Sequence, residues 1–463
     1  MTVAGRKRNS AGATEQGMRR VRASELLRTR KLWLAPLLIA SVFIALISTI
    51  YIGSVVNPAG HLHGLPVMLV NEDRGAVVQG HRVDVGASLA SAVEGSAALM
   101  SRLKLRSATL TRARATMDKG GAYATVIIPA TLTRSLLLAA GVDTPGSSPP
   151  TQAKVELQEN PRLGNLGVNL AAGVITPAIA QISPQVGKQL SALASTKARA
   201  NPVIAAQIAN PLALATTTYR PLPDHSALGL SAFYMALLSI LSGFIAATLI
   251  NSSIDSALGY STTEIGPRWR QRRPVAISRR QTLLTKWAIA AIVVPVLAAI
   301  LVLIAAGALG MYAPHVVLLW LLATLAALMI ATGTLTLLAA FGAIGQLLAM
   351  LLLIYLSLAS SGGTVPIQAL PGFFNVVGHV EPLRNVLMGT RAILYFDAKG
   401  DAGLTHSLIV IATGLLFWAT IGLAITSWYD RRKLDRISPD ILSYVERAID
   451  GTAERGAVEP GGS

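Results

Sequence analysis

One uncharged apolar stretch constrains the fold of this chain more than any other feature of its sequence. Residues 32–56 (LWLAPLLIASVFIALISTIYIGSVV) contain no charged side chain, and 25 residues in a helix are enough to cross a bilayer. The preceding residues hold nine Lys or Arg against two Asp or Glu. The run is too long for the apolar core of a secretory signal, and no clear cleavage site follows it. We therefore predict a membrane anchor after a basic cytoplasmic tail (1–31) that ends in a short amphipathic helix.

Further apolar stretches follow in the second half of the sequence. Hydrophobic residues make up 52% of the 463 residues and charged residues only 14%, which is typical of several membrane spans. A turn signal at Gly342 divides the longest run into two spans. The sequence thus predicts an α-helical polytopic membrane protein with six transmembrane helices, one followed by five, and an inserted extracytoplasmic α/β domain. The five later spans form a membrane domain (228–427) and are expected at about 228–250, 287–311, 316–339, 342–360 and 405–427.

The distribution of positive charge predicts the orientation of these spans. Lys and Arg gather before the first span and in the stretch 251–286, which has seven of them against two acidic residues. The positive-inside rule places both segments in the cytoplasm, together with the C-terminal tail 428–463. Residues 57–227 and 361–404 then lie on the extracytoplasmic side. We expect a multi-pass plasma membrane protein with both termini in the cytoplasm.

The exported segment 57–227 alternates strand-like and helix-like patterns, which predicts an α/β domain with a partly parallel sheet. Residues 164–199 contain Pro177 and Pro184, which predict a helix with kinks or breaks, either a stalk or a second layer near the membrane. The chain has no cysteine, so no disulfide holds this domain. Strands are expected at 65–71, 122–129 and 154–158, and helices at 85–100 and 130–140.

A polar cluster follows the first predicted strand of the α/β domain. The simplest interpretation of Asn71, Glu72 and Asp73 is a turn that ends at Gly75, because Asn and Asp bend chains and Gly accepts a positive φ. The alternative is that these three residues contact a cation or another ligand, although two adjacent carboxylates are an incomplete oxygen site. The pair His61 and His63 also lacks a third metal ligand nearby. We predict neither a metal nor a cofactor.

The sequence carries no recognisable catalytic or nucleotide-binding motif. It has no glycine-rich loop that ends in Gly-Lys-Ser or Gly-Lys-Thr, and no serine nucleophile elbow. The predicted spans contain no Asp, Glu, Lys or Arg, whereas ion-coupled carriers place such residues inside the membrane. We predict that the chain is not an enzyme and that any transport by it is driven by a partner.

The stretch 268–280 (RWRQRRPVAISRR) is the most basic part of the predicted cytoplasmic loop. Its charges could fix the orientation of the spans and meet anionic lipid headgroups. They could instead form a docking surface for a cytoplasmic protein. Nucleic-acid binding is not expected, because Trp269 is the one aromatic residue among these arginines and the segment lies beside the membrane. The candidate docking residues are Arg268, Arg270, Arg272, Arg273, Arg279 and Arg280.

Glycine and proline end the predicted fifth span on the extracytoplasmic side. The stretch 360–374 (SSGGTVPIQALPGFF) is apolar enough to return to the membrane as a re-entrant element. The stretch 381–391 (EPLRNVLMGTR) then predicts an amphipathic helix at the membrane surface. The candidate residues of the re-entrant element are Gly362, Gly363, Pro366, Pro371, Phe373 and Phe374.

Three stretches carry a resemblance to a known family. They are LPVMLVNEDRGA (65–76), AYATVIIPATLTRSL (122–136), and SGGTVPIQALPGFF followed by EPLRNVLMGTR (361–391). Together they resemble the phage-infection-protein (YhgE/Pip) family, whose membrane half is similar to permeases of type-2 ABC exporters. The resemblance implies that the 251–286 loop and the helix before the first span couple to a separate ATPase. The longest family members have a much larger external region, so their phage-receptor role is not expected here.

These observations lead to two hypotheses of different classes. In the first, the chain is a permease-like subunit of an ABC type-2 exporter that moves an amphipathic or lipid-like substrate outward with a separate ATP-binding subunit. Its partners would be membrane lipids, that ATPase, and a second permease chain in a homo- or heterodimer. In the second, the chain is a non-transporting envelope scaffold, receptor or secretion-system accessory protein that binds through its ectodomain. Co-purification of an ATP-binding subunit would discriminate between them.

Overall fold

The computed structural model describes residues 30–78, 80–142, 154–265, 268–270, 272–434 and 436. The chain divides into two compact units, residues 1–53 and 54–463. Helix α2 (Arg30–Val55) supplies the described part of the first unit, and it coincides with the first predicted span. Most of its large apolar side chains are exposed, as expected of a helix whose environment is lipid. The basic tail before residue 30 lies outside the described residues.

The second unit begins with an α/β domain, as predicted. Its sheet has the strand order β4-β1-β5-β6-β7. Strand β1 pairs in parallel with β4 and β5, whereas β6 runs antiparallel to β5 and parallel to β7, so the sheet is partly parallel. The strands are β1 (Leu65–Asn71), β4 (Leu103–Ser107), β5 (Ala124–Ile128), β6 (Lys154–Glu159) and β7 (Ala213–Thr218).

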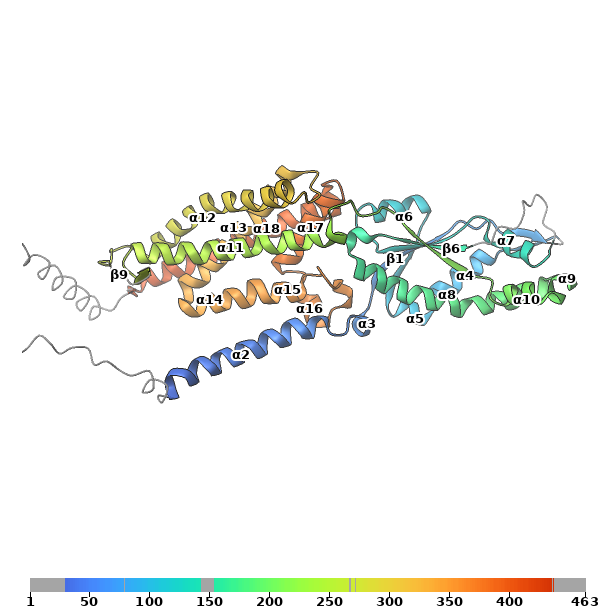
Figure 1. Ribbon diagram of the computed structural model, residues 1–463, viewed down its shortest axis with the longest axis horizontal. Coiled ribbons are helices and arrows are strands. Elements are labelled where there is room, and N and C mark those ends of the chain that lie inside the picture. The colour runs from blue at the N-terminus through green and yellow to red at the C-terminus, as the bar shows by residue number, and fades with distance from the viewer. Residues whose placement is uncertain are drawn as a thin grey trace, which may run out of the picture. The chain divides into compact units, whose positions relative to one another are not determined.

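Helices cover both faces of this sheet. Side chains of a strand alternate between its faces, and Met68 and Val70 of β1 share a core with Met117 of α6. Figure 1 shows α6 on one face and α8 on the other. The remaining elements are a hairpin of β2 (Ala76–Val78) and β3 (His81–Val83), and the helices α3 (Pro58–His61), α4 (Val85–Glu94), α5 (Ala97–Met100), α6 (Leu110–Met117), α7 (Leu132–Ala139), α9 (Thr196–Ala200) and α10 (Pro202–Ala209).

Helix α8 (Asn165–Leu193) corrects the prediction of a broken helix. It is continuous through Pro177 and Pro184 and packs against β1 and the helices α4, α5, α7 and α10. Its buried residues Val168, Ile175 and Ile182 recur every two turns, so one continuous apolar face holds the helix on the domain despite the backbone bonds lost at proline. Helix α8 is therefore a layer of the α/β domain and not a stalk.

The helices that follow the α/β domain form a bundle, which contains a helix at each of the five later predicted spans. Helix α13 (Val316–Phe341) is central and contacts α11 (Leu230–Ala257), α12 (Arg279–Val302) and α18 (Leu404–Arg431), which run alongside it (Figure 1).

The fifth span consists of α14 (Ala343–Ala349), a π-helical turn η4 (Met350–Tyr355) and α15 (Leu356–Ser360), and it begins at Gly342 with a φ of +60°. A second π-helical turn, η3 (Leu303–Ala308), extends α12. Together with α2 and α8, seven described helices are long and apolar enough to cross a membrane.

The observed helices are longer than predicted at the end of the bundle that holds the basic loop. Helix α11 continues to Ala257 and α12 begins at Arg279, so the predicted loop 251–286 contracts to 258–278, with β8 (Thr263–Ile265) and β9 (Arg268–Arg270) inside it. Asp255 and Lys286 consequently lie in helices, where they form a buried ion pair. The prediction that the spans lack ionisable residues is thus wrong for the helices as they fold. The hydropathy of the sequence falls before α11 ends at Ala257 and rises only after α12 has begun at Arg279.

Two short helices complete the bundle. Helices α16 (Gly372–Val377) and α17 (Pro382–Tyr395) follow the fifth span. Most of α17 is buried, and the helix contacts α11, α13 and α18. The predicted helix at 381–391 is confirmed, but it is packed inside the bundle and does not lie on its surface. The burial of α17 places its ionisable side chains where the bundle meets the α/β domain, a region that we call the junction.

Candidate functional site

The turn after β6 joins the α/β domain to the bundle. Asn160 is 1% exposed, and its side-chain amide donates to the carbonyl of Met117 at 2.9 Å. This bond fixes the 3₁₀ turn η1 (Pro161–Leu163) that follows. In that turn Arg162 Nη1 donates to the carbonyl oxygen of Tyr395 at 2.7 Å, at the C-terminal end of α17. Burial lowers the pKa of Arg162, and the neighbouring charge of Arg220 lowers it further.

A buried tyrosine lies beside this turn. Tyr123 precedes β5, is 8% exposed, and packs its ring against Gly167 in the first turns of α8. A Cβ at Gly167 would approach the ring to 2.2 Å, so only glycine fits here. Burial raises the pKa of Tyr123, while the charges of Arg391 and Arg384 oppose that rise. The phenol is therefore neutral and faces two arginines.

A buried carboxyl group begins α17. Glu381 is 5% exposed, and its side chain accepts hydrogen bonds from the backbone N–H groups of Leu383 at 2.9 Å and Arg384 at 3.2 Å. These bonds cap the helix N-terminus and favour the ionised form. Burial is the stronger effect and raises the pKa of Glu381 to about 7. The carboxyl group is therefore poised to titrate near neutral pH.

Two arginines of α17 occupy the junction with little compensating charge. Arg384 and Arg391 are seven residues apart, which is two helical turns, so they lie on one face. Arg391 Nη2 donates to the carbonyl oxygen of Gly363 at 3.3 Å, but Arg391 Nε and Arg384 Nη1 are buried without a hydrogen-bond partner. Among the described residues no carboxylate forms an ion pair with either arginine. Burial lowers the pKa of both guanidinium groups.

Arg391 separates two cavities. Cavity A has a volume of about 200 Å³ and lies between η1, the start of α8, the start of α11 and the segment after α15. Cavity B has a volume of about 470 Å³ and lies between η1, α17 and the start of α18. Leu163 and Arg391 line both. The other residues of cavity A include Tyr123, Gly164, Leu228, Gly362, Gly363, Thr364 and Pro366, and those of cavity B include Lys119, Met388, Phe396, Asp401, His406 and Ile409.

This arrangement combines apolar walls with a poorly compensated cation. A buried charge without a partner is costly, and an anion in either cavity would reduce that cost. The lining of cavity A is mostly apolar or glycine apart from Arg391. Cavity B adds His406 and the ion pair of Lys119 with Asp401, whose charged atoms are 2.7 Å apart. Chemically, the site is suited to bind a molecule with an anionic group and an apolar body. No group of three metal-ligating side chains occurs among the described residues.

Comparisons with known proteins place the chain in a family. A family model described as "Protein of unknown function (DUF3533)" matches residues 35–414, which is most of the chain. The chain belongs to the DUF3533 family. Among solved structures, the "Crystal structure of a domain of a putative ABC type-2 transporter from Thermotoga maritima MSB8" is similar at 20% identity with a TM-score of 0.23. The similarity covers 33% of this DUF3533 chain and 85% of that domain. No curated protein matches.

The structure brings half of the predicted re-entrant residues to the junction of this DUF3533 protein. Gly362, Gly363 and Pro366 line cavity A, and Gly362 has a φ of +69°. The other three residues belong to α16, beyond the cavity. Pro371 caps that helix, Phe374 is buried, Phe373 is exposed, and the two phenylalanine rings meet edge to face at 5.2 Å.

The predicted docking arginines fall into three groups. Arg268 and Arg270 are in β9, which pairs antiparallel with β8. Arg272 and Arg273 are exposed beyond that hairpin. Arg279 and Arg280 begin α12, and their backbone N–H groups donate to the carboxylate of Asp430 at 2.9 and 3.1 Å. The guanidinium of Arg279 also donates to the carbonyl oxygen of Leu434 and lies 5.0 Å from the centre of the Tyr429 ring. Arg279 therefore makes contacts inside the chain, and the docking role of all six arginines stays a prediction.

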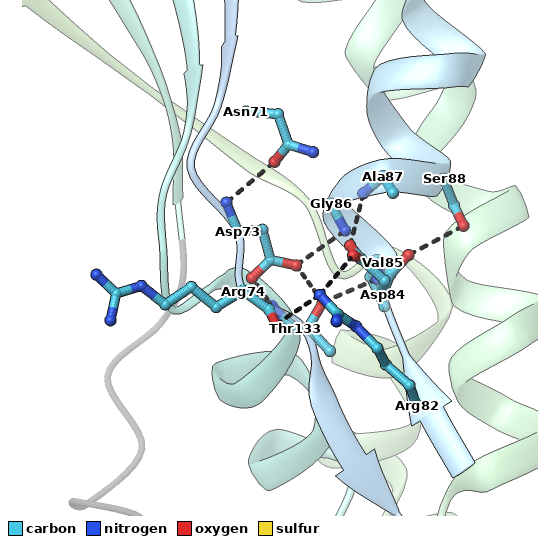
Figure 2. A network of polar contacts seen from close by, with 10 residues as sticks. All are labelled: Asn71, Asp73, Arg74, Arg82, Asp84, Val85, Gly86, Ala87, Ser88 and Thr133. Atoms are coloured by element: carbon cyan, nitrogen blue, oxygen red, sulfur yellow. Dashed lines mark hydrogen bonds and ion pairs between the residues drawn. The ribbon is translucent and has the colours of Figure 1, made fainter. Parts of the chain in front are cut away.

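The polar cluster after β1 forms a turn whose central carboxylate bonds to two helices (Figure 2). The backbone N–H of Asp73 donates to Asn71 Oδ1 at 3.0 Å. Asp73 Oδ2 accepts from the backbone N–H of Gly86 at 3.0 Å, and Oδ1 accepts from that of Thr133 at 3.1 Å, at the starts of α4 and α7. The Thr133 hydroxyl donates to the same carboxylate. This geometry satisfies the carboxylate internally and leaves Glu72 exposed at the surface.

Sequence reasoning did not single out Arg384, Arg391, Tyr123, Arg162 or Glu381. The seven-residue spacing of the two arginines was a usable signal, because it places both on one face of the predicted amphipathic helix. Nothing in the sequence indicates that η1, more than 200 positions earlier, covers their face of α17. The contact of Arg162 with Tyr395 is visible only in the fold.

Proposed function

We propose that this DUF3533 protein is a permease-like membrane subunit that moves an anionic amphipathic molecule outward, driven by a separate ATP-binding subunit. One observation carries the proposal. It is the pair of cavities on the two sides of Arg391, where the helical bundle meets the α/β domain.

The charge and shape of the cavities support an amphipathic ligand. Arg391 offers a buried Nε without a partner, and no carboxylate among the described residues compensates it. An ion pair with a bound carboxylate or phosphate gains more in such a low-dielectric site than at the surface. The apolar walls would hold the hydrocarbon part of the same molecule. A long-chain acid or a lipid with an anionic headgroup has both features.

The position of α17 supports a passage from one cavity to the other. Leu163 of η1 and Arg391 of α17 line both cavities, so these two side chains form the boundary between them. The hydrogen bond from Arg162 to Tyr395 holds η1 and α17 together. A shift of α17 against η1 would break this contact and join the cavities. We propose that this shift is the step by which the α/β domain controls release.

The driving force is assigned to a partner because the sequence has no nucleotide-binding loop. The exposed residues Arg272 and Arg273, in the contracted loop 258–278, are the proposed contact for an ATP-binding subunit. The long apolar helices other than α8 support a multi-pass membrane protein. In the predicted topology, this loop faces the cytoplasm and the junction faces outward.

A binding experiment tests the site. The full chain in lipid nanodiscs would be titrated with a dansyl-labelled fatty acid and with the methyl ester of the same acid. We expect the acid to bind more tightly, and Arg391→Gln to weaken its affinity by about tenfold, because a buried charge pair is lost. Arg106→Gln is the matched control, since Arg106 is exposed on edge strand β4 of the α/β domain. Equal affinities for acid and ester, or equal effects of both variants, would refute the site.

A second experiment tests the coupling to an ATPase. The tagged chain would be isolated from native membranes and the co-purified proteins identified, with ATPase activity measured at increasing concentrations of the fatty acid. We expect an ATP-binding subunit in the preparation and stimulation by the acid that Arg391→Gln abolishes. If the acid binds but no ATP-binding protein accompanies the chain, the export proposal fails and the non-transporting envelope protein becomes the better hypothesis.

A further inference from the structure

A third cavity, which we call cavity C, lies at the junction and has a different chemistry. It has a volume of about 110 Å³ and lies between the end of α6, η1, the residues after β7, the loop before α13 and the end of α17. It shares Phe396 with cavity B and no described lining residue with cavity A. Its polar and charged lining residues include Asp118, Asn160, Arg162, Tyr219, Arg220, Tyr312, Asp397 and Lys399.

Asn160 brings a buried hydrogen-bond acceptor to cavity C. Its side-chain nitrogen donates to the carbonyl oxygens of Met117 at 2.9 Å and Ala122 at 3.3 Å, so both N–H groups are used. The side-chain oxygen Oδ1 is buried and has no hydrogen-bond partner among the described residues. Because a side chain that is 1% exposed rarely leaves its oxygen unsatisfied, Oδ1 is a candidate contact for a ligand that donates a hydrogen bond.

Arg162 brings a buried donor to the same cavity. Its two terminal nitrogens donate to the carbonyl oxygens of Tyr395 at 2.7 Å and Pro221 at 3.2 Å. Its Nε is buried and has no hydrogen-bond partner among the described residues. One donor and one acceptor are the complement of a hydroxyl group, which both accepts and donates a hydrogen bond. The pair therefore favours a ligand that carries hydroxyl groups.

The charged residues of the lining favour a neutral ligand. Asp118 Oδ1 lies 3.0 Å from Arg220 Nε, and Asp397 Oδ1 lies 3.1 Å from His315 Nε2. An anion in cavity C would meet the carboxylate of Asp118, whereas a cation would meet the guanidinium of Arg162. Carboxylates accept hydrogen bonds and guanidinium groups donate them, so a lining with both can bind several hydroxyl groups at once.

Aromatic side chains supply the walls of the cavity. Burial lowers the pKa of Arg162, and the phenol groups of Tyr312 and Tyr219 oppose this fall, which places both phenols near the guanidinium. Arg220 lies 5.6 Å from the centre of the Tyr219 ring and covers one of its faces. The negative face of an aromatic ring attracts C–H groups, which line the faces of a sugar ring, while the sugar hydroxyls point to its rim. The other apolar lining residues include Pro223, Pro314 and Phe396.

The volume of cavity C limits how far a ligand enters. It is about seven times the roughly 15 Å³ that one water needs, but smaller than a cavity of about 150 Å³ that holds benzene. One edge of a sugar ring would therefore enter, and the rest of the ring would lie among the exposed lining residues Arg220, Asp397 and Lys399.

We propose that cavity C binds the terminal ring of a neutral sugar, with one hydroxyl group that accepts from Arg162 Nε and donates to Asn160 Oδ1. The proposal does not rest on the export of an anionic molecule, because it involves neither Arg391 nor an ATP-binding subunit. A zwitterionic amino acid also carries a donor and an acceptor, so the test must separate the two ligand classes.

Sugar binding would be measured by saturation-transfer difference NMR. The full chain would be placed in phosphatidylcholine nanodiscs, free of maltoside detergents whose sugar headgroups would compete, and titrated with the methyl α-glycosides of glucose, galactose and mannose and with L-alanine. We expect saturable binding of at least one glycoside and none of L-alanine. If no glycoside binds, water alone satisfies the two buried groups and the proposal is overturned. Displacement of a bound glycoside by L-alanine would overturn the sugar assignment in favour of an amino-acid site.

Two matched tyrosine variants test the location of the sugar. Tyr312→Leu removes a wall of cavity C and should weaken glycoside binding by about fivefold. Tyr234→Leu is the control, because Tyr234 is 53% exposed on α11 and does not line the cavity, and it should change the affinity by less than about twofold. A melting temperature equal to that of the parent chain shows that each variant is folded. Equal losses of affinity in the two variants would overturn the assignment to cavity C.

A third variant tests the buried donor. In Arg162→Lys the ammonium group can still donate to the carbonyl oxygen of Tyr395, but no donor remains at the position of Nε. We expect about tenfold weaker binding of the glycoside, as for one lost hydrogen bond to a charged group. Parent-like affinity in both Arg162→Lys and Tyr312→Leu would show that the sugar binds elsewhere, which would refute the proposal.

Discussion

The two ends of the bundle differ in whether their cationic side chains have a carboxylate partner. At the end of the bundle that holds the loop 258–278, which we call the loop end, Lys286 and Arg436 both pair with Asp255 at 3.0 Å or less. At the junction end, Arg384 and Arg391 each have one buried nitrogen atom without a hydrogen-bond partner, and neither forms an ion pair among the described residues. A buried cation with its own carboxylate is part of the fold, whereas one without is a candidate ligand group. The comparison implies that removal of a charged side chain should destabilise the loop end and leave the junction almost unaffected.

The largest expected effect on stability is at the loop end. Asp255→Ala leaves Lys286, whose side chain is 6% exposed, without its counter-ion, and we expect a loss of about 3–5 kcal/mol in the free energy of unfolding. Unfolding in mixed micelles with increasing sodium dodecyl sulfate, followed by circular dichroism, measures it. The double variant Asp255→Leu/Lys286→Met removes both charges and should recover most of the loss. A loss of about 1 kcal/mol or less, the size for an exposed pair, would contradict the assignment of a structural ion pair.

The next effect concerns the buried carboxyl group of α17, Glu381. Its pKa in the fold, about 7, lies above the ordinary value of 4.5, so the folded chain binds more protons than the unfolded chain between these pH values. The contribution of Glu381 to stability is therefore most favourable below about pH 4.5 and is lost as pH rises through 7, by roughly 3 kcal/mol in total.

Thermal unfolding between pH 5 and pH 8 tests this dependence. Glu381→Gln keeps a side-chain oxygen for the start of α17 and should flatten the dependence of the melting temperature on pH over this range. Glu72→Gln is the control, because Glu72 is an exposed carboxylate of the α/β domain and should leave the slope unchanged. A slope that survives in Glu381→Gln would show that another group titrates.

These elements also show what the sequence could and could not predict. Apolar runs identified α11, α12, α13, α14–α15 and α18, because a membrane span must be long and continuous. Strands β1, β5 and β6 were predicted because buried strands are rich in β-branched residues. The edge strands β4 (LKLRS) and β7 (ALATTT) were missed, since their charged or threonine-rich sequences resemble loops.

The candidate site was only partly predictable. Gly362 and Gly363 were found from their break in the fifth span, which is a local signal. Arg391 depends on the burial of α17 against η1, a contact between distant segments that no local pattern encodes. Asp255 and Lys286 were placed in a loop, because the hydropathy falls before α11 ends whereas helical hydrogen bonding continues to Ala257. Local periodicity predicts elements, but the charge balance of a site requires the tertiary contacts.

A smaller effect tests how tightly the junction is packed. Gly167→Ala would place a Cβ within 2.2 Å of the Tyr123 ring, and we expect a loss of about 1–3 kcal/mol through overpacking. Gly173→Ala, in the same helix, meets no atom within 4 Å and should instead stabilise α8 by up to about 1 kcal/mol through helix propensity. The melting temperatures of the two variants should therefore shift in opposite directions. Shifts of the same sign would show that Tyr123 is free to move away.

The smallest effect on the free energy of unfolding is expected for a variant of Arg391, and it tests directly whether the two ends of the bundle differ. Arg391→Met removes a buried charge and replaces it with an apolar side chain of similar length. The variant loses the bond to the Gly363 carbonyl oxygen but also the cost of a poorly compensated guanidinium, so the free energy of unfolding should change by less than about 1 kcal/mol. The same micelle unfolding measures it beside Asp255→Ala. A loss as large as that of Asp255→Ala would mean that Arg391 has a structural partner, and the two ends would no longer differ. Near-neutral stability, together with weakened fatty-acid binding, would separate a residue kept for its ligand from one kept for the fold.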